Sequence, residues 1–524
     1  MRAIMTVPAL LAETLEICAE KKALFQGDQS ISFEDLHFHA LSTAHHLRDL
    51  GIGKGDRVGV CMGKGIDQAI CILGAMYANA VFVPVLPKLK HANIEHIILD
   101  SGMKALFTDA TRLEEVKDFA GRTKLLIGAG PTLEDFPCFP YLRKHFPCRD
   151  SFFDCIGMDN AAIIYSSGST GRPKGIVISH RNLSDGARIV SAYTGTTRDD
   201  RIAGILSLNF DYGLNQLWQT IYKGASLYFH DLLFPKDFFE MLHGEKITSL
   251  PLMPVIMTRM FDQRFYSPNP AHGFSNLRFI TSSGGNVSPR MIENLETAFP
   301  SARICLMYGL TEAFRSSFLP PEQIKVRPRS IGKAIPDVEL YVLDNELNVC
   351  PPGVSGQLVH RGGCMSKGYW NQPEKSAECF REIPMFPGEK VLFSGDTVRA
   401  DEEGYIYFIA RGDSMIKTHG YRVSPTEIEE EAATHEKITA AVAFGVDNVD
   451  IGQDIVLAYE TADQVELNEK LLLNFLKQLL PSYMAPRYLL HFTQFPSTGN
   501  DGKVDRVWIQ AKSMELLGIA EVGR

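Results

Sequence analysis

The chain of 524 residues lacks several patterns that mark large classes of protein. Its ten cysteines include no Cys-x-x-Cys pair, and its fifteen histidines show no metal-ligand spacing. These absences argue against a disulfide framework or a zinc site, and they favour reduced thiols in a cytoplasmic protein. No long basic run is present and the net charge is -9, so nucleic acid is not an expected partner.

Long hydrophobic runs are also scarce. The N-terminus has no secretory pattern, because three glutamates interrupt its early apolar residues. The stretch 69–86 is uncharged and nearly all apolar, but a glycine, an asparagine and a proline break it. We therefore predict a buried helix over 68–78 followed by a buried strand over 81–85, and no membrane span.

The order of the remaining patterns predicts the domain organisation. A chain of this length exceeds one hydrophobic core. Helix-like and strand-like segments alternate up to about residue 330, which predicts an α/β domain with layered sheets. Among them we predict a helix that Ser32 caps, and strands over 202–208 and 304–307. Short β-like runs then predict a small antiparallel barrel or sheet over 331–412, which completes an N-terminal domain 1–412. A mixture of helix and strand patterns predicts a small α+β C-terminal domain over 413–524.

One loop stands out between two short apolar runs, 161–164 and 176–178, which we predict to be buried strands. Residues 165–175 read Tyr-Ser-Ser-Gly-Ser-Thr-Gly-Arg-Pro-Lys-Gly. Glycines let a backbone approach a ligand closely, while hydroxyls, main-chain N–H groups and Lys174 suit phosphate oxygens. No Gly-Lys-Ser/Thr run opens a helix, so this is not a P-loop. The pattern indicates a polyphosphate cradle, with a flexible linker as the alternative.

Three further stretches place polar groups in turns or at strand ends. Residues 308–312, Tyr-Gly-Leu-Thr-Glu, offer a ring that can stack on a purine and a carboxylate that can hold Mg²⁺. Residues 394–396, Ser-Gly-Asp, offer a carboxylate suited to a ribose diol. Residues 499–506 place Lys503 in a glycine-flanked loop. Taken singly, each is explained as well by an ordinary turn.

Read together and in order, these stretches resemble the motifs of the adenylate-forming superfamily, which includes acyl-CoA synthetases, adenylation domains of nonribosomal peptide synthetases and luciferases. The stretches that carry the resemblance are 31–36, 73–84, 166–175, 308–312, 356–374, 394–396, 411–429 and 498–506. The resemblance implies layered mixed sheets, a β-barrel subdomain and a mobile C-terminal domain. It also implies a ligase that first joins a carboxylate to AMP from ATP. A thiol of CoA or of carrier-protein phosphopantetheine then displaces AMP.

The same resemblance implies roles for single residues. Lys503 would stabilise charge that grows between the carboxylate and the α-phosphate. Glu312 would hold Mg²⁺, with Thr170 beside the phosphates and Lys174 on the pyrophosphate. Tyr308 would stack on adenine, and Asp396 with Arg411 would bind the ribose. The other implied nucleotide contacts are Ser166, Ser167, Gly168, Ser169, Gly171, Gly284, Gly285, Gly309 and Thr311.

The composition changes near Arg411, Gly412 and Asp413, where the resemblance implies a hinge. Rotation there would let the C-terminal domain present Lys503 in one pose and Gly420 in the other. Gly420 has no side chain, so a pantetheine arm could pass it, and Lys417 belongs to the same region. The alternative is an ordinary solvent-exposed linker.

The stretch 209–215, Asn-Phe-Asp-Tyr-Gly-Leu-Asn, bears on the substrate. It lacks the Pro-x-x-His pattern of simple fatty acyl-CoA synthetases and resembles the Phe-Asp-x-Ser region of amino-acid adenylation domains, with Gly213 in place of serine. Asp211 would pair with a substrate ammonium group, or would cap the following helix. Arg315 would neutralise an acidic substrate group or pair with a neighbour. The other implied pocket residues are Tyr212, Asn215, Pro251, Ser283, Met307 and Ser316.

We therefore predict an AMP-forming acid–thiol ligase for a small carboxylic acid, in the first place an amino acid. A short or aromatic acid without an amine is the second interpretation, and a non-catalytic nucleotide-binding scaffold the third. The joint presence of five residues disfavours a scaffold: Lys174, Glu312, Asp396, Arg411 and Lys503. No phosphopantetheine serine motif follows Lys503, so we expect a carrier protein to act in trans.

Overall fold

The computed structural model describes residues 6–129, 154–167, 173–232, 235–261, 274–284, 287, 289–411, 416–423, 425–461, 465–498, 503–504 and 506–519. The chain divides into two compact units. The first comprises Met1–Ser166, Lys174–Ser283 and Pro289–Ala410, and the second comprises Ser167–Pro173, Gly284–Ser288 and Arg411–Arg524. The boundary predicted at 412 and the proposed hinge residues Gly412 and Asp413 lie outside the described residues.

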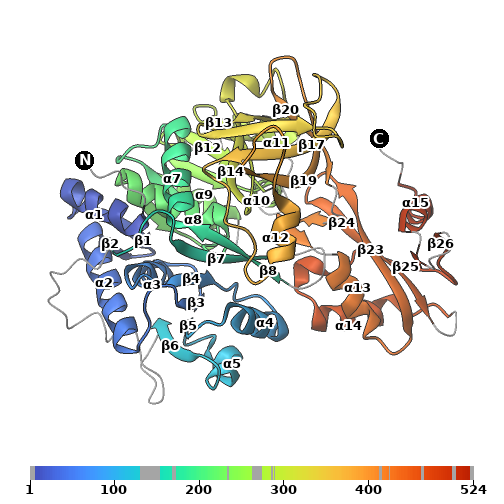
Figure 1. The fold of residues 1–524 in the computed structure, drawn as a ribbon, viewed down its shortest axis with the longest axis horizontal. Helices are drawn as coiled ribbons and strands as arrows, with labels where there is room; N and C mark the ends of the chain where they lie inside the picture. Colours follow the sequence, from blue (N-terminus) through green and yellow to red (C-terminus); the bar gives the residue numbers. More distant parts are fainter. Residues whose placement is uncertain are drawn as a thin grey trace. The chain divides into compact units, whose positions relative to one another are not determined.

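The first unit contains two β-sheets, of which the smaller has six strands in the order β6-β5-β3-β4-β7-β8 (Figure 1). Its strands are β3 (Arg57–Cys61), β4 (Val81–Pro84), β5 (Ala105–Asp109), β6 (Lys124–Ala129), β7 (Asn160–Ser167) and β8 (Pro173–Ser179). The first five run parallel. Parallel neighbours need crossover connections, and α3 (Ile66–Tyr77), α4 (His91–Ser101) and α5 (Leu113–Val116) supply three of them.

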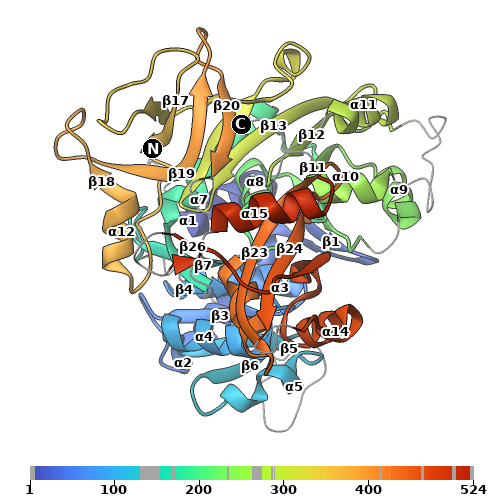
Figure 2. The ribbon, with the colours of Figure 1, turned by 90° about the vertical axis from the view of Figure 1, so that its right-hand side faces the viewer.

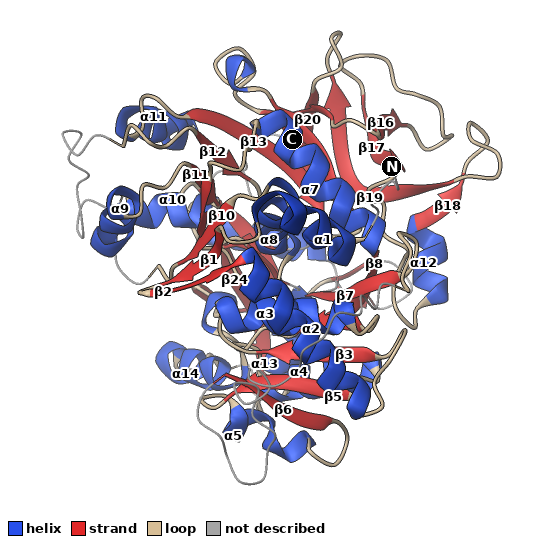
Figure 3. Cartoon of the chain, turned by 90° about the vertical axis from the view of Figure 1, so that its left-hand side faces the viewer, coloured by secondary structure: helices blue, strands red, loops and turns tan. Residues whose placement is uncertain are grey.

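The predicted helix over 68–78 and strand over 81–85 are confirmed as α3 and β4. Helix α3 is buried at every position except Asp67. It packs against β3 and β4 of the smaller sheet and against β1 (Lys22–Gln26) of the larger one (Figure 3). Burial between two sheets explains why this stretch is apolar all round without spanning a membrane. Within the described part of the chain, no helix combines the length and apolar character that crossing a membrane requires.

Helix α2 (Phe33–Asp49) begins directly after Ser32, which is its cap residue as the sequence predicted. The Ser32 Oγ accepts a hydrogen bond from the Asp35 N–H (3.0 Å), and the Asp35 carboxylate accepts one from the Ser32 N–H (2.9 Å). This reciprocal capping satisfies two N–H groups that a helix start would otherwise leave unpaired. Helix α2 packs on α3 and so helps to cover the smaller sheet.

The larger sheet has fourteen strands, of which thirteen follow the order β16-β17-β19-β20-β15-β14-β13-β12-β11-β9-β10-β1-β2. Its first group is β1, β2 (Gln29–Ser32), β9 (Arg201–Gly204), β10 (Ser226–Phe229), β11 (Ser249–Leu252), β12 (Phe279–Ser282) and β13 (Arg303–Leu310). Its second group is β14 (Ala313–Leu319), β15 (Ser330–Ala334), β16 (Val338–Leu343), β17 (Ser355–Gly362), β18 (Phe380–Glu382), β19 (Lys390–Ala400) and β20 (Ile406–Arg411). The first group is parallel except for β2. In the second group, the pairs β14–β15, β15–β20, β16–β17, β17–β19 and β18–β19 are antiparallel.

The β-rich stretch after residue 330 therefore continues the larger sheet, where the sequence predicted a small barrel or sheet of its own. The reason is the hairpin between β13 and β14, which reverses the strand direction. Strand β15 pairs with β14 on one side and β20 on the other, so the antiparallel strands extend the sheet already present.

Helices cover the larger sheet and join it to the smaller one. They are α1 (Val7–Cys18), α7 (His180–Thr194), α8 (Asp211–Lys223), α9 (Pro235–Gly244), α10 (Pro254–Met260), α11 (Pro289–Ala298) and α12 (Pro373–Cys379). One hydrophobic core contains residues of both sheets and of α8. Within it, the rings of Phe82 from β4 and Trp218 from α8 lie 6.2 Å apart, edge to face. The two sheets of the first unit therefore share a core.

The second unit has a five-stranded sheet in the order β22-β21-β24-β23, with β25 beside β24 (Figure 2). Its strands are β21 (Ile416–Thr418), β22 (Tyr421–Val423), β23 (Ile438–Asn448), β24 (Gly452–Thr461) and β25 (Tyr488–His491). Its helices are α13 (Pro425–Ala433), α14 (Glu469–Leu479) and α15 (Arg506–Leu516), and β26 (Ser497–Thr498) pairs with β27 (Lys503–Val504). Ile428 and Leu472 belong to one core and Ile509 to another. The predicted α+β class is confirmed.

Three local predictions need correction. The strand predicted over 202–208 ends at Gly204. The backbone that follows, at Ser207, packs instead against Gly213 in the first turn of α8. The strand predicted over 304–307 continues to Leu310, and strand β14 was missed, since its sequence Ala-Phe-Arg-Ser-Ser-Phe-Leu contains no β-branched residue. Lys503 was placed in a loop but starts strand β27, because its backbone pairs with Thr498.

Candidate active site

Glu312 lies in the turn between β13 and β14. Leu310 and Ala313 are register partners, so Thr311 and Glu312 form a two-residue turn. The Glu312 side chain is buried, and its Oε1 accepts a hydrogen bond of 2.8 Å from the Tyr369 hydroxyl. Burial, together with the Glu312 charge, raises the pKa of Tyr369. The hydroxyl therefore stays protonated and donates to Glu312 across the physiological range.

Tyr308 and Asp396, predicted for adenine and ribose, lie in contact. The Tyr308 hydroxyl on β13 donates to Asp396 Oδ2 on β19. The Asp396 N–H donates to Ser394 Oγ at 3.1 Å, and that hydroxyl donates to the Leu358 carbonyl at 2.8 Å. The stretch 394–396, which the sequence placed in a turn, lies instead within β19 and holds the buried Asp396 carboxylate beside Tyr308.

His360 on β17 completes this group and was missed from the sequence. Its ring stacks on Tyr308, with centroids 6.4 Å apart and planes 28° from parallel. Burial lowers the pKa of His360 to about 4, against the opposing effect of the Asp396 charge. Neither ring nitrogen has a hydrogen-bond partner among the described residues. The alternation of β17 could have suggested an inward-facing residue here, but not its neighbours.

The predicted phosphate loop joins β7 and β8, two neighbouring strands, as expected. Lys174 on β8 is buried. The pKa of Glu378 on α12 is lowered, chiefly by a hydrogen bond from Lys375 and to a smaller extent by the charge of Lys174. A Cβ atom on Gly175 would lie 2.7 Å from Ile163 Cγ2 and 3.2 Å from Trp370 Cβ. The end of the loop therefore packs too tightly for any residue except glycine.

Several predicted loop and hinge residues lie outside the described residues: Gly168, Ser169, Thr170, Gly171, Gly285 and Asp413. For Ser167, Arg411 and Lys503 the structure describes the backbone. Ser166 is the last but one residue of β7, and Gly309 lies within β13. Gly284 follows β12 with φ of +86°, in the left-handed region that favours glycine.

Asp211 and Arg315, predicted for the acid pocket, form an ion pair. Arg315 Nη1 lies 3.5 Å from Asp211 Oδ2, and the Arg315 side chain is only 3% exposed. The guanidinium carbon lies 5.2 Å from the Tyr212 ring centroid. Arg315 Nε and Nη2 are buried without a partner among the described residues. Of the two alternatives for Arg315, pairing with a neighbour is therefore the one seen here.

Asp211 is the first residue of α8, and the cap residue before it is Phe210. The Asp211 carboxylate accepts a hydrogen bond from the Tyr212 N–H at 2.9 Å. The alternative role of Asp211 as the cap residue is therefore wrong by one position, although the acid still lies in the first turn, where the helix dipole favours it.

Gly213 shows why the pattern 209–215 has glycine where the resembled motif has serine. A Cβ atom at this position would lie 1.9 Å from the Ser207 carbonyl oxygen. The backbone of 205–210 thus passes directly against the first turn of α8. A serine there would require the two segments to separate.

The other predicted pocket residues lie on neighbouring elements. Pro251 of β11 is the register partner of Thr281 on β12, and Ser283 follows that strand. Asn215 lies on α8 and Ser316 on β14, both buried. Met307 Sδ accepts a hydrogen bond from the Tyr193 hydroxyl at 2.7 Å. Of this set, Pro251 and Ser283 lie toward the carboxyl ends of parallel strands, where ligands bind in open α/β sheets.

Two neighbours of the pocket, Thr281 and Tyr193, were missed. Thr281 Oγ1 and the Tyr212 hydroxyl lie 2.8 Å apart. A signal for Thr281 existed, since it precedes Ser283 by two residues on a strand and so shares its face. Tyr193 lies on α7, stacked on Phe318 at 4.3 Å, and no motif marked it.

In the second unit, Gly420 and Lys417 belong to the hairpin of β21 and β22. Thr418 and Tyr421 are register partners, so His419 and Gly420 form the turn, with φ of 53° and 78°. Such a two-residue turn needs positive φ at both positions, which favours glycine. The Lys417 N–H donates to Gln453 Oε1 at 2.9 Å.

The residues fit a magnesium ion carried by a nucleotide. Within the described ranges, no group of three or more His, Cys, Asp or Glu side chains gathers to hold a metal. Glu312 is instead a single buried carboxylate with an ordered hydrogen-bond donor. Mg²⁺ commonly takes one or two protein carboxylates and completes its shell with phosphate oxygens and water. Glu312 therefore suits that ion only together with the phosphates.

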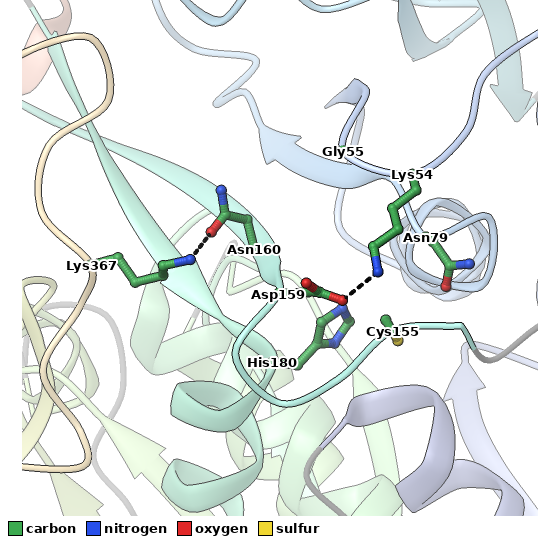
Figure 4. A pocket seen from close by; sticks show the side chains of 8 residues that line it. All are labelled: Lys54, Gly55, Asn79, Cys155, Asp159, Asn160, His180 and Lys367. Carbon is green, nitrogen blue, oxygen red and sulfur yellow. Dashed lines mark hydrogen bonds and ion pairs between the residues drawn. The ribbon is translucent and has the colours of Figure 1, made fainter.

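A separate cavity of about 200 Å³ lies elsewhere in the first unit (Figure 4). Its lining is Lys54, Gly55, Asn79, Cys155, Asp159, Asn160, His180 and Lys367. Lys54 Nζ pairs with Asp159 Oδ2 at 2.9 Å, and Lys367 Nζ donates to Asn160 Oδ1 at 2.7 Å. Burial raises the pKa of the Cys155 thiol and lowers that of His180 to about 4. The cavity therefore offers neither a reactive thiolate nor a base tuned near neutral pH.

Comparison with known proteins gives one family. The model of a family described as AMP-binding enzyme matches residues 11–370. The chain is 28% identical over 509 residues to tyrocidine synthase 1 from Brevibacillus parabrevis. It is 30% identical over 511 residues to surfactin synthase subunit 2 from Bacillus subtilis (strain 168). Each match covers 96% of this chain, but the chain spans only 44% and 14% of these two relatives.

Solved structures share the fold. A double mutant of o-succinylbenzoate CoA synthetase from Bacillus subtilis matches with a TM-score of 0.83 at 20% identity, over 96% of this chain and 98% of that one. The amide bond synthetase from Marinactinospora thermotolerans matches with a TM-score of 0.83 at 20% identity, over 97% and 99%. Anthranilate CoA ligase in complex with anthranoyl-AMP matches with a TM-score of 0.73 at 24% identity, over 98% of both chains. At these identities the likeness establishes the fold alone.

Proposed function

The chain belongs to the family of AMP-binding enzymes. We propose that it is an AMP-forming ligase, which adenylates a small carboxylic acid and then transfers the acyl group to a phosphopantetheine thiol. One observation carries the proposal. The hairpin of β13 and β14 brings together a ring for adenine, a carboxylate for ribose and a carboxylate for the metal. Tyr308, on this hairpin, contacts Asp396, and Glu312 forms the turn of the same hairpin.

In the first half-reaction, a carboxylate oxygen of the acid attacks the α-phosphorus of ATP, and the bond from that phosphorus to the pyrophosphate oxygen breaks. Asp396 holds the ribose and Tyr308 the adenine, which fixes the α-phosphorus in line with the acid. Lys174 stabilises the charge of the departing pyrophosphate. Lys503 stabilises the charge at the α-phosphate, and Glu312 would hold Mg²⁺, which would neutralise phosphate charge.

In the second half-reaction, a thiol sulfur bonds to the acyl carbon and AMP leaves with the bonding electron pair. The thiol belongs to CoA or to the phosphopantetheine arm of a carrier protein. We assign Gly420 to the passage of that arm. Gly420 is the residue without a side chain in the two-residue turn that it forms with His419, and Lys417 lies on β21 of the same hairpin. The proposed hinge near Asp413 would let one domain serve both steps.

The first candidate substrate is an amino acid. Asp211 lies in the acid pocket and is only partly covered, with its side chain 18% exposed. Its contact with Arg315 is long, at 3.5 Å, and therefore leaves part of its charge for an ammonium group. The similarity to tyrocidine synthase 1 and surfactin synthase subunit 2 extends over 96% of the chain, which supports an amino acid as the first candidate.

The second candidate is a short or aromatic acid without an amine. The same ion pair favours it, because Arg315 already supplies Asp211 with a positive partner. A buried carboxylate that is paired gains less from a further cation than an unpaired one.

ATP–pyrophosphate exchange with matched pairs of acids separates the two candidates. Each pair consists of an amino acid and its deamino analogue, presented to the purified protein with ATP and Mg²⁺. We expect exchange with one or a few small amino acids and much weaker exchange with their analogues. Exchange with the analogues alone would establish the second candidate. No exchange with any acid, from a protein that binds ATP, would overturn the proposed reaction.

A further inference from the structure

The segment 365–371 touches both the Glu312 turn and the strand that leaves the phosphate loop. The Ser366 N–H donates to the Glu312 carbonyl at 2.7 Å. The Trp370 N–H donates to the Gly175 carbonyl, also at 2.7 Å. Between them, the Val177 N–H donates to the Gly368 carbonyl at 2.9 Å. The segment thus lies alongside β8 while its first residues are bonded to the turn.

Tyr369 lies at the centre of this segment, and contacts fix both its backbone and its ring. Its backbone bridges to Ile176 of β8, and its N–H donates to Ser376 Oγ on α12 at 2.8 Å. Its ring meets that of Phe380 edge to face at 6.3 Å. With the backbone and ring fixed in this way, the hydroxyl reaches Glu312 Oε1 at 2.8 Å.

We propose that Tyr369 is a positioning residue, which holds the Glu312 carboxylate for the magnesium ion of the nucleotide and ties it to the phosphate-loop strand. This inference rests on the proposed function, since it assumes that the site binds a nucleotide with its metal. The hydroxyl occupies Oε1 and leaves Oε2 to the ion or to one of its waters. Because the donor is neutral, the hydrogen bond brings no positive charge that would compete with the ion for Glu312.

The expected size of the effect follows from comparable sites. Carboxylates that ligate metals are themselves hydrogen-bonded, and loss of such a partner lowers metal affinity about 10–100-fold. A hydrogen bond to an ionised acceptor is also stronger than one between neutral groups. Removal of the hydroxyl should therefore weaken magnesium binding without weakening contacts to the base or ribose.

Tyr369→Phe tests the proposal, because it removes the hydroxyl and keeps the ring against Phe380. ATP affinity is measured by titration calorimetry across a series of MgCl₂ concentrations, and in EDTA, with no acid substrate present. We expect the MgCl₂ concentration that gives half of the affinity gain to rise about 10–100-fold, with the affinity in EDTA unchanged. The melting temperature is recorded alongside as a check on the fold.

Tyr341→Phe is the matched control. It removes a hydrogen bond of the same kind, from Tyr341 to Glu339 Oε2 at 2.9 Å, on an exposed part of the larger sheet. Its magnesium dependence should equal that of the wild type. An equal shift in both variants would show a general effect of losing a tyrosine hydroxyl and would overturn the proposal.

Glu312→Gln separates positioning from packing. In this background Tyr369→Phe should have no further effect on magnesium dependence, because the carboxylate it orients is gone. An undiminished effect would mean that Tyr369 acts through its packing, and would overturn the inference. If wild-type protein bound ATP equally with and without Mg²⁺, both the inference and the proposed metal role would fail. If ATP affinity depended on Mg²⁺ in the wild type and Tyr369→Phe had the same magnesium dependence, the inference alone would fail.

Discussion

Three carboxylates of the first unit are held in two different ways. Glu312 and Asp396 each accept a hydrogen bond from a neutral tyrosine hydroxyl, that of Tyr369 and that of Tyr308. Asp211 instead faces the buried guanidinium of Arg315 at 3.5 Å. The first arrangement belongs to the proposed nucleotide region and the second to the proposed acid pocket.

The difference concerns how much charge each region keeps for its ligand. A hydroxyl orients a carboxylate without cancelling its charge, so the negative charge remains for a metal ion or for ribose hydroxyls. A guanidinium both orients and neutralises, so a substrate ammonium group must share Asp211 with Arg315. The nucleotide region is therefore ready for its ligand, whereas the acid pocket must redistribute charge when the acid binds.

Lys503→Ala should have the largest effect. It removes the cation proposed to stabilise the transition state of adenylation, and neither the nucleotide region nor the acid pocket supplies another cation in that role. We expect adenylate formation, measured by pyrophosphate exchange, to fall about 1,000-fold. Thioester formation from a supplied acyl-adenylate should stay near the wild-type rate. Lys512→Ala removes an exposed lysine of α15 that bonds Glu515, and is the control. Equal loss of both half-reactions, with the fold intact, would contradict this division of labour.

Asp211→Asn tests the acid pocket and should have the next largest effect. It keeps the shape of the side chain but leaves Arg315 without its acidic partner and the substrate amine without an anchor. We expect kcat/KM for the amino acid to fall about 100-fold, and that for its deamino analogue to fall far less. Pyrophosphate exchange measures both. Equal losses on the two acids would remove the amine-anchor role of Asp211.

Arg315→Met, added to Asp211→Asn, sharpens this result. The single variant contains a buried guanidinium without its counter-charge, which is costly. The double variant contains neither charge, so it should melt at a higher temperature than Asp211→Asn alone. A double variant that is less stable than the single would mean that Arg315 is stabilised by groups other than Asp211.

Tyr308→Phe tests the nucleotide region and should have a smaller effect. It keeps a ring for adenine but removes the hydrogen bond that orients Asp396 toward the ribose. Hydrogen bonds to charged groups contribute about 1.5–3 kcal/mol, so we expect the preference for ATP over 2′-deoxyATP to fall about 10-fold. Binding affinities of the two nucleotides measure this preference. Tyr407→Phe, which removes a bond of 3.1 Å to Asp401, should leave the preference unchanged.

The sequence predicted these two regions unequally well. Each nucleotide motif is local, so residues such as Tyr308 and Glu312 were identified from a single short stretch. Asp396 was identified in the same way, but its contact with Tyr308 was not, and neither was the contact of Tyr369 with Glu312, because each joins elements far apart along the chain. The pair of Asp211 and Arg315 is likewise a tertiary contact, formed by a helix and a strand that the sequence did not reveal as a strand. The sequence showed only that Gly213 replaces the serine of the resembled motif. The reason is tertiary, because the Ser207 carbonyl oxygen leaves no room for a Cβ atom at this position.

His360 gives the smallest effect, and it concerns the stability of the nucleotide region. Its pKa in the folded protein is about 4, below the ordinary histidine value near 6.5 that the unfolded chain has. Between these values the unfolded chain binds more protons, so stability falls as the pH falls from about 6.5 toward 4. From pH 7 to pH 5.5 the loss should be about 1 kcal/mol for this one histidine.

His360→Phe keeps a flat ring stacked on Tyr308 and removes the titration, so its urea midpoint should fall less than that of the wild type between pH 7 and pH 5.5. Part of the slope should remain, because burial also lowers the pKa of His180 to about 4. His180 lies in the separate cavity, away from Asp396, so the two contributions should add. An unchanged slope in His360→Phe would mean that the ring beneath Tyr308 accepts a proton without cost. The surroundings of His360 would then be able to rearrange around a charged ring, even though Tyr308 and Tyr369 hold the neighbouring carboxylates by hydrogen bonds.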